Sequence, residues 1–387
     1  MVGNQKPTMG GFPLRGFFMS EILEDEDSTE ELLEKTGKKS RGETKVQSLD
    51  QIDEDQEFLP TGIGEIDSSV GGIPLGAIMH IAGPSGVGKT TLVSQMVVFA
   101  LSKLAENFKA YFSDFEGRVQ LRMIRYFCKL YNVNPSRILY ARPTNGEDGG
   151  TTISNYVDDP DVIITVIDSL KAIIPKATIE QNIDQNERQR AQAGLIDRIL
   201  RSIVNRVAEN KKSIICIDHL KEKGKVMNKY PIYETTSGET IRFFASTRWF
   251  IYPRKKITKT ENGITKDLGR ILLIKIPKST VSSMASIEGL SFYFRRGISP
   301  YKWYLIKARE FGLLHVDKNG TQKSYRVGKG EKSRTVAKNK KELIAWITGA
   351  GSKIWSKLTT LIIDKEKQSF IDKLNADPEI FNSEFDE

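Results

Sequence analysis

The sequence predicts an α/β fold in which helices flank a mostly parallel central sheet. Two observations lead to this prediction. Short apolar runs alternate with helical hydrophobic periods from about Phe58 onward, and a glycine-rich stretch separates one such run from a helical segment. The 387 residues exceed one ordinary compact domain, so appended segments are expected as well. Hydrophobic residues make up 39% of the chain, enough for a sizeable core, which excludes fibrous and wholly disordered classes.

Six short apolar runs are the candidates for buried strands, because a strand covered on both faces is apolar along its whole length. In chain order they are residues 78–82, 110–113, 162–167, 213–217, 246–251 and 270–276. The clearest helix is predicted over residues 195–207, where apolar positions recur at helical spacing. A second helical segment is predicted over residues 91–103.

Shifts in composition divide the chain into four predicted parts. Residues 1–57 form an arm with little core of its own, residues 58–299 the α/β core, residues 300–376 a small basic domain of helical character, and residues 377–387 an acidic tail. Two apolar clusters interrupt the arm, so it either contacts a neighbouring subunit or is a disordered leader.

The net charge of +9 is concentrated in one stretch. Residues 301–341 carry twelve basic and three acidic side chains, which matches the excess of the whole chain. A local basic field can attract a polyanion such as nucleic acid, and the alternative is a solvated basic surface.

Two features indicate the compartment. No run of about 18 apolar residues occurs, so no membrane span is predicted. The only two cysteines, Cys128 and Cys216, lie far apart, which argues against a disulfide scaffold and for a reducing, cytoplasmic location.

The glycine-rich stretch matches the phosphate-binding pattern G-x-x-x-x-G-K-[ST]. An apolar run precedes it and a helical segment follows, so backbone N–H groups can surround phosphate oxygens at a helix N-terminus. Lys89 is expected to reach the β- and γ-phosphates, and the Thr90 hydroxyl to hold Mg²⁺. The alternative is a chance match in a turn, which the flanking strand and helix disfavour. The predicted nucleotide-binding residues here are Gly83, Pro84, Ser85, Gly86, Val87, Gly88, Lys89, Thr90 and Thr91.

Two carboxylates follow predicted strands. Asp168 ends an apolar run, where parallel strands present their ligand side, and is predicted to contact Mg²⁺ through water; the alternative is a helix N-cap. Glu116 follows another strand and is a candidate to orient and activate the attacking water, with Asp114 as its competitor and a plain surface charge as the alternative.

Several segments together resemble the RecA-type recombinases, and within them the UvsX type of T-even phages. The resemblance covers about three-quarters of the chain, from Phe58 to Trp346. The segments that carry it are residues 59–62, 71–76, 83–91, 114–116, 167–170, 217–219, 234–238, 242–248, 297–301 and 308–314.

The resemblance implies a RecA-like phosphate-loop ATPase core that uses ATP and Mg²⁺. It implies a DNA-dependent ATPase that forms filaments on single-stranded DNA and catalyses homologous pairing and strand exchange in recombination, repair and recombination-dependent replication. The implied partners are single-stranded DNA, homologous duplex DNA, further copies of this chain, a single-strand-binding protein and a loader, with no membrane. A phage origin would place the protein in the cytoplasm of a bacterial host.

The resemblance also assigns roles to residues outside the loop. His219 becomes the γ-phosphate sensor, because many bacterial members have Asn-Gln where this chain has Asp218-His219 and the UvsX type has histidine in the second position. Taken alone, a histidine after a strand would be a structural residue. The implied catalytic set is Glu116, Lys89 and His219. Lys278 is the implied contact to a neighbouring subunit's nucleotide, and Thr280 stands where a second basic residue is expected.

Two segments are expected to be DNA-binding loops, over residues 175–194 and 220–238. Cations in such loops neutralise phosphates and aromatic rings stack against bases, whereas the alternative is a pair of solvated polar loops. The predicted DNA-contact residues are Arg188, Arg190, Lys221, Lys223, Lys225, Lys229, Tyr230 and Tyr233.

Three competing functions share the same core. A hexameric DNA helicase would unwind duplex DNA directionally without needing homology. A non-hydrolysing recombination mediator would keep the fold but is disfavoured by the intact Lys89, Thr90, Glu116 and Asp168. A signalling ATPase of the clock-protein type is disfavoured because its duplicated core is missing.

Overall fold

A computed structural model describes residues 56–180, 185–226, 230–235, 240–282, 284–319, 322–328, 333–348, 350–355, 357–359, 361–362 and 365. The predictions for nearly all of the N-terminal arm and for the acidic tail fall outside these residues, as does the predicted DNA contact Lys229.

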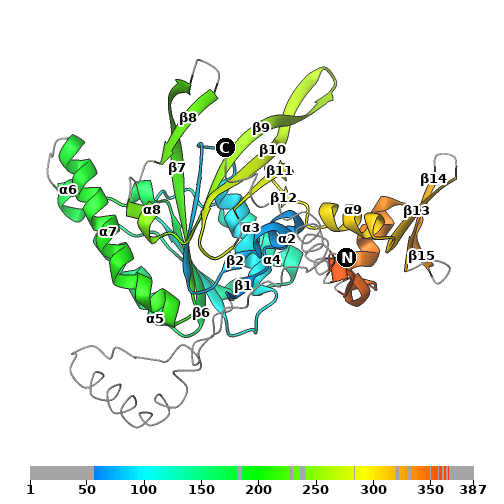
Figure 1. Ribbon diagram of the computed structural model, residues 1–387, viewed down its shortest axis with the longest axis horizontal. Coiled ribbons are helices and arrows are strands. Elements are labelled where there is room, and N and C mark those ends of the chain that lie inside the picture. Colours follow the sequence, from blue (N-terminus) through cyan, green and yellow to red (C-terminus); the bar gives the residue numbers. More distant parts are fainter. Residues whose placement is uncertain are drawn as a thin grey trace, which may run out of the picture. The chain divides into compact units, whose positions relative to one another are not determined.

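The core is a ten-stranded sheet with the order β12-β11-β10-β9-β3-β7-β6-β4-β5, and β8 pairs with β7 (Figure 1). The strands from β9 to β5 run parallel and those from β9 to β12 antiparallel, so the predicted mostly parallel sheet is confirmed. In chain order the strands are β3 (Ala77–Gly83), β4 (Lys109–Asp114), β5 (Ile138–Ala141), β6 (Val162–Asp168), β7 (Ser213–Val226), β8 (Tyr230–Thr235), β9 (Thr247–Glu261), β10 (Ile264–Ser279), β11 (Ala285–Tyr293) and β12 (Gly297–Ile298). A separate two-stranded sheet pairs β1 (Phe58–Leu59) with β2 (Ile73–Pro74).

Helices cover both faces of the sheet, because alternate residues of a buried strand point to opposite sides. Met79 and Ile81 of β3 pack into one apolar cluster, whereas Ile78 packs into the other. The first cluster includes residues of α2 (Gly64–Val70), α3 (Lys89–Leu101) and α4 (Leu121–Tyr131). The second includes residues of α5 (Gly146–Asp158), α7 (Gln185–Glu209) and α8 (Thr240–Phe244). The short helices η2 (Pro135–Arg137), η3 (Leu170–Ala172) and α6 (Lys176–Glu180) complete this part of the chain.

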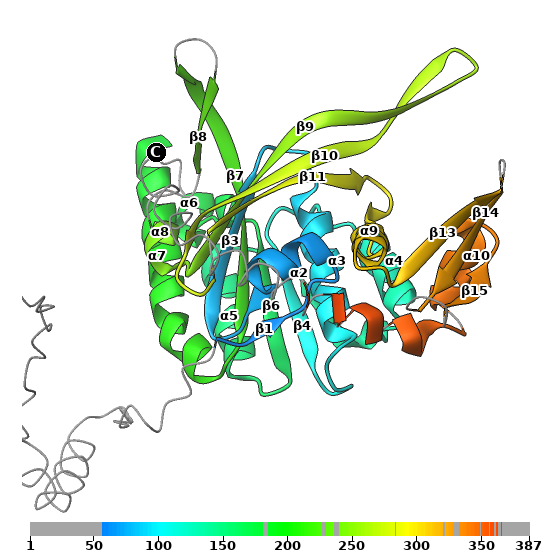
Figure 2. The same ribbon diagram turned by 45° about the vertical axis from the view of Figure 1, so that its right-hand side comes forward.

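Strands β9 and β10 are much longer than predicted. They contain 15 and 16 residues and form a hairpin that projects from the sheet (Figures 1 and 2). Their outer halves are polar and exposed, so a search for apolar runs could only find their buried ends. Asn262 and Gly263 at the tip have positive φ angles of 51° and 76°, a conformation typical of tight hairpin turns.

The region after Gly297 has a separate apolar core, and it is not purely helical as predicted. Between α9 (Lys302–Glu310) and α10 (Lys340–Thr348), three strands form an antiparallel sheet: β13 (Leu314–Asn319), β14 (Gln322–Val327) and β15 (Arg334–Ala337). Trp303, Leu343 and Ile347 belong to its core. The strands escaped prediction because they are short and half-exposed, so charged residues interrupt their apolar positions.

Both cysteines are free and buried, Cys128 in α4 and Cys216 in β7. Burial raises the pKa of each thiol. Among the helices that the structure describes, none is long and apolar enough to cross a membrane.

Candidate nucleotide site

The phosphate loop connects β3 to α3, as predicted. Gly86 and Gly88 have φ angles of 73° and 102°, which side chains rarely tolerate. A Cβ at Gly88 would also collide with the ring of Phe292. The chain therefore needs glycine at position 88 for both backbone conformation and space, and α3 begins directly after it at Lys89.

Lys89 is the first residue of α3 and is 6% exposed. Its ammonium group donates hydrogen bonds to the carbonyl oxygens of Gly83, at 2.8 Å, and Pro84, at 3.1 Å. Burial lowers its pKa, whereas the charges of Asp168 and Glu116 oppose that shift. The fold thus holds a nearly buried cation beside the loop, where a phosphate tail would compensate it.

Asp168 lies at the C-terminal end of β6, opposite Asp114 on β4. The hydroxyl of Thr90 donates a hydrogen bond to Asp168 Oδ2 at 2.6 Å. Burial raises the pKa of Asp168 to about 6, although the Thr90 hydrogen bond acts in the opposite direction. The N-cap alternative is wrong, because Ser169 and not Asp168 occupies the N-cap position of η3.

Glu116 contacts His219 across the pocket. Glu116 Oε1 lies 2.6 Å from His219 Nε2, and the hydroxyl of Ser169 donates a second hydrogen bond to the same oxygen. Partial burial would raise the pKa of Glu116, but the hydrogen bonds from Ser169 and His219 outweigh it and lower the pKa. The structure therefore brings together two residues separated by about a hundred positions, which were predicted separately.

Asp114, the predicted competitor of Glu116, is 1% exposed and saturated with hydrogen bonds. It accepts from the backbone N–H groups of Gly117, Arg118 and Val119 at 2.8, 3.2 and 3.0 Å, and from the Tyr140 hydroxyl at 2.9 Å. Its carboxylate is thus committed to holding the turn that carries Glu116 and faces the protein rather than the pocket.

Residues of the phosphate loop, together with Glu116, Asp168 and His219, surround a cavity of about 400 Å³. Part of its lining was not among the predicted site residues, namely Ser94, Arg118, Gln120, Met123, Phe292 and Phe294. Phe292 lies in β11 and Phe294 directly follows that strand, both far away along the chain, so no local spacing could have indicated them. Arg118 lies only two residues after Glu116, and that proximity was the one available signal.

Lys278 does not line this cavity within the described chain. Its ammonium group donates a hydrogen bond to the carbonyl oxygen of Arg242 at 2.8 Å, and it pairs in register with Arg248 of the neighbouring strand. Burial and the charges of Arg248 and Arg242 lower its pKa. Thr280 donates to the carbonyl oxygen of Ser246 at 3.1 Å. Any role of Lys278 at a nucleotide would therefore require a second copy of the chain.

The two segments predicted as irregular loops are largely regular. Residues 175–194 contain α6 and the first turns of α7, where Arg188 and Arg190 are exposed. The second segment begins directly after His219 and forms an antiparallel ribbon of β7 and β8, which includes the backbone of Lys223, Lys225, Tyr230 and Tyr233. Lys221 at its start is exposed. Figures 1 and 2 show the ribbon and the start of α7 on the same end of the sheet.

The fold and the site define an α/β nucleotide-binding protein with a phosphate loop at the carboxyl end of a parallel sheet. The RecA N-terminal domain family matches residues 29–299, so the chain belongs to the RecA family. It is 30% identical to Protein RecA of Bacteroides thetaiotaomicron over 326 residues, which cover 82% of this chain and 92% of that protein. It is 33% identical to Protein RecA of Geobacter sulfurreducens over 305 residues, which cover 76% of this chain and 85% of that protein.

Proteins of this family use ATP with Mg²⁺, and the residues present fit both. The loop offers backbone N–H groups and the nearly buried ammonium of Lys89 to phosphate oxygens. The hydroxyl of Thr90 and the carboxylate of Asp168 are hard oxygen ligands that already lie within hydrogen-bond distance, the donor type that Mg²⁺ prefers.

Proposed function

We propose that this protein is a DNA-dependent ATPase that forms filaments on single-stranded DNA and catalyses homologous pairing and strand exchange in recombination, repair and recombination-dependent replication. The observation that carries the proposal is the 2.6 Å contact between Glu116 and His219. Glu116 lines the cavity of the phosphate loop, and His219 directly precedes the β7–β8 ribbon. One contact therefore joins the nucleotide site to the candidate DNA segment.

Within the family we propose the UvsX type of T-even phages. The support is Asp218-His219 at the head of the second DNA-binding segment, where that type has histidine in the second position. The proposed parts are the arm (residues 1–57), the ATPase core (58–299), a small basic domain (300–376) and the acidic tail (377–387).

In the proposed mechanism the chain's own groups divide the work. Glu116 orients the attacking water and accepts its proton, and its lowered pKa keeps the carboxylate ionised at neutral pH. Lys89 and the loop N–H groups stabilise the charge that develops on the phosphate oxygens. Thr90, directly, and Asp168, through water, would hold Mg²⁺, which would supply positive charge to neutralise the triphosphate. His219 senses the γ-phosphate and transmits its presence to the ribbon.

The nucleotide base has a candidate place as well. Met123, Phe292 and Phe294 give one part of the cavity an apolar lining, whereas Lys89 and Asp168 make the phosphate end polar. An aromatic wall suits a planar base, because stacking gains energy without a specific hydrogen-bond pattern. The base therefore lies against these side chains in the proposed complex.

We propose that single-stranded DNA contacts the ribbon and the start of α7, through Arg188, Arg190, Lys221, Lys223, Lys225, Lys229, Tyr230 and Tyr233. The support is the exposure of Arg188, Arg190 and Lys221, together with the place of the ribbon and the start of α7 on the same end of the sheet (Figures 1 and 2). Lys221 also lies only two residues after His219. Cations there neutralise the backbone and tyrosines stack on bases, so no base-specific contact is needed.

Replacing Lys221, Lys223 and Lys225 together with alanine tests this interface. Affinity for single-stranded DNA should fall, and the slope of log affinity against log salt should decrease by roughly three. Fluorescence anisotropy with a labelled oligonucleotide measures both. Replacing Lys103 and Lys129, exposed lysines near α3 and in α4, is the matched control and should leave the slope unchanged. An unchanged slope in the triple variant means that the second segment is assigned wrongly.

Filament formation completes the proposal. A neighbouring copy would place its Lys278 on the nucleotide, which agrees with Lys278 lying outside the cavity of its own chain. A single-strand-binding protein and a loader are the further proposed partners, along with homologous duplex DNA.

One set of assays separates the candidate functions. ATP turnover is measured with and without single-stranded DNA, and homologous strand exchange is then assayed with the same preparation. The proposal expects turnover stimulated by single-stranded DNA together with strand exchange. Directional unwinding without homology would identify a helicase instead, and binding without turnover a mediator.

A further inference from the structure

A row of polar side chains crosses the middle of the sheet, on the face that packs against α7. The strands β9, β3 and β7 are neighbours, and they contribute Arg248, His80 and Asp218. Arg248 pairs in register with His80, and Asp218 lies two positions beyond Cys216, the residue paired with His80 on β7. Side chains at such diagonal positions of one sheet face are within reach of each other.

His80 is fully buried, and both of its ring nitrogens have partners. The guanidinium Nε of Arg248 donates to His80 Nδ1 at 3.3 Å, and His80 Nε2 lies 3.4 Å from Asp218 Oδ2. Because arginine stays protonated, Nδ1 must be the acceptor, and the hydrogen of the ring therefore sits on Nε2, facing Asp218. Burial lowers the pKa of His80, so the ring is neutral.

Asp218 links this row to the nucleotide site. It is 0% exposed, and its Oδ1 accepts the backbone N–H of His219 at 2.7 Å. The side chain of His219 in turn reaches Glu116 at 2.6 Å. The carboxylate of Asp218 thus fixes the point where β7 leaves the buried sheet and presents His219 to the cavity.

We propose that His80 is a positioning residue: its Nε2–H orients the Asp218 carboxylate, which holds His219 against Glu116 in the geometry needed for ATP turnover. The inference rests on the proposed function, because it assumes that Glu116 and His219 act at the γ-phosphate. A buried polar side chain costs free energy unless its hydrogen bonds compensate it, and an apolar residue would fill the same interior volume. The chain nevertheless places histidine here, one step from the proposed catalytic pair.

Three substitutions at this position separate the two hydrogen bonds. In His80→Gln an N–H can occupy the place of Nε2 and reach Asp218. In His80→Asn the shorter amide keeps an acceptor for Arg248 but cannot reach Asp218, and His80→Leu removes both partners. DNA-stimulated kcat should fall about tenfold in His80→Leu and His80→Asn, and His80→Gln should recover to within about threefold of the unchanged protein. The KM for ATP and the affinity for ADP should change less than twofold in all three variants, because the phosphate loop is unchanged.

A merely structural histidine would give a different order. Loss of packing would lower thermal stability without separating His80→Gln from His80→Asn in kcat. The inference is wrong if His80→Leu keeps full kcat, or if His80→Gln is as impaired as His80→Asn. Should His80→Leu fail to fold, the comparison of the glutamine and asparagine variants decides alone.

A second readout does not depend on turnover. The chain has only three histidines, so NMR can follow their ring nitrogens in the full-length protein after ¹⁵N labelling of histidine. His80 should appear as the neutral Nε2–H form, and the His219 signals should shift in His80→Asn but much less in His80→Gln. Unmoved His219 signals in both variants would overturn the inference. If the unchanged protein lacks DNA-stimulated turnover, the proposed function fails instead, and the NMR comparison still decides the role of His80.

Discussion

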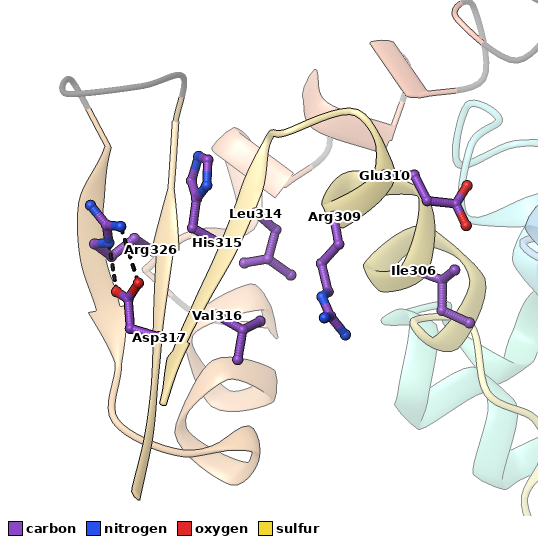
Figure 3. A pocket seen from close by; sticks show the side chains of 8 residues that line it. All are labelled: Ile306, Arg309, Glu310, Leu314, His315, Val316, Asp317 and Arg326. Atoms are coloured by element: carbon purple, nitrogen blue, oxygen red, sulfur yellow. Dashed lines mark hydrogen bonds and ion pairs between the residues drawn. The ribbon is translucent and has the colours of Figure 1, made fainter. Parts of the chain in front are cut away.

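Two cavities formed by described residues can be compared, and the larger of the two does not contain the phosphate loop. A cavity of about 590 Å³ lies between α9 and β13–β14, whereas the phosphate-loop cavity is about 400 Å³. Figure 3 shows charged side chains around the larger cavity. Arg326 there forms a bidentate interaction with Asp317, in which Nε donates to Oδ2 at 2.7 Å and Nη2 donates to Oδ1 at 3.1 Å. These two groups are well exposed to solvent.

The smaller cavity has a different electrostatic character. Lys89 and Asp168 are each 6% exposed, and burial shifts the pKa of both toward the neutral form. Holding such charges away from water is unfavourable for the folded chain alone, and a triphosphate with Mg²⁺ would compensate it. Buried charges with shifted pKa values therefore indicate a ligand site better than cavity volume does.

The largest expected effect is on ATP turnover, when the buried cation of the smaller cavity, Lys89, is removed. In Lys89→Ala, ATP turnover should fall at least about 100-fold, because the cation that stabilises the phosphate charge is lost. Phosphate release measures it, and circular dichroism checks that the fold persists. Arg309→Ala, which removes a cation from the larger cavity, is the matched control and should change turnover less than about twofold. Full turnover in Lys89→Ala would show that this cavity is not the active site.

Glu116→Gln sharpens the assignment within the smaller cavity. The amide keeps the size of the side chain but cannot accept a proton, so kcat should fall about 100-fold while nucleotide binding persists. Single-turnover kinetics and a fluorescent ADP analogue measure the two quantities separately. Loss of binding without loss of kcat at saturation would mean that Glu116 supports the pocket and does not activate water.

A smaller effect is expected at Asp114, whose carboxylate accepts three backbone N–H groups. Asp114→Asn should lower the free energy of unfolding by about 1–3 kcal/mol, because buried donors lose a charged acceptor. Urea denaturation measures it. Asp161→Asn is the matched control, since Asp161 forms a solvent-exposed ion pair with Lys109 at 3.0 Å and its loss should lower the free energy of unfolding less than Asp114→Asn does. Equal losses in both variants would contradict the role of Asp114.

The smallest effect is expected for the Arg326–Asp317 pair of the larger cavity. A double-mutant cycle with alanine should give a coupling free energy of less than about 1 kcal/mol, which decreases further in high salt because the pair is exposed. Thermal or urea unfolding at two salt concentrations measures it. A coupling of several kcal/mol would place this pair in the same class as the buried charges and would weaken the comparison.

The sequence was sufficient for the parts of the molecule that depend on local pattern. Residues 78–82 and 162–167 are apolar except for His80 and Thr165, because both faces of their strands are covered, and the phosphate loop follows directly from glycine spacing. The strands β13, β14 and β15 were not predictable in this way, since one exposed face mixes charges into each short run. For the same reason only the buried ends of β9 and β10 were found.

In the candidate site, too, residues within local motifs were predictable and residues brought in by strand pairing were not. Lys89, Thr90 and Asp168 were found by motif and by their place at strand ends, and the structure brings Thr90 and Asp168 together. The wall formed by Phe292 and Phe294 depends on how β11 pairs with β10, which no spacing in the chain encodes. The two segments predicted to bind DNA were expected to be loops, but the sequence of a polar segment does not distinguish a loop from an exposed helix or ribbon.

The two buried thiols have a practical consequence for the chemistry of this protein. Only the thiolate is nucleophilic, so Cys128 and Cys216, hidden from solvent and with raised pKa values, should react slowly with alkylating reagents and oxidants. A single cysteine introduced at the exposed Ile264, near the hairpin tip, would then be the one readily alkylated thiol. A fluorophore attached there would follow the hairpin without any background substitution.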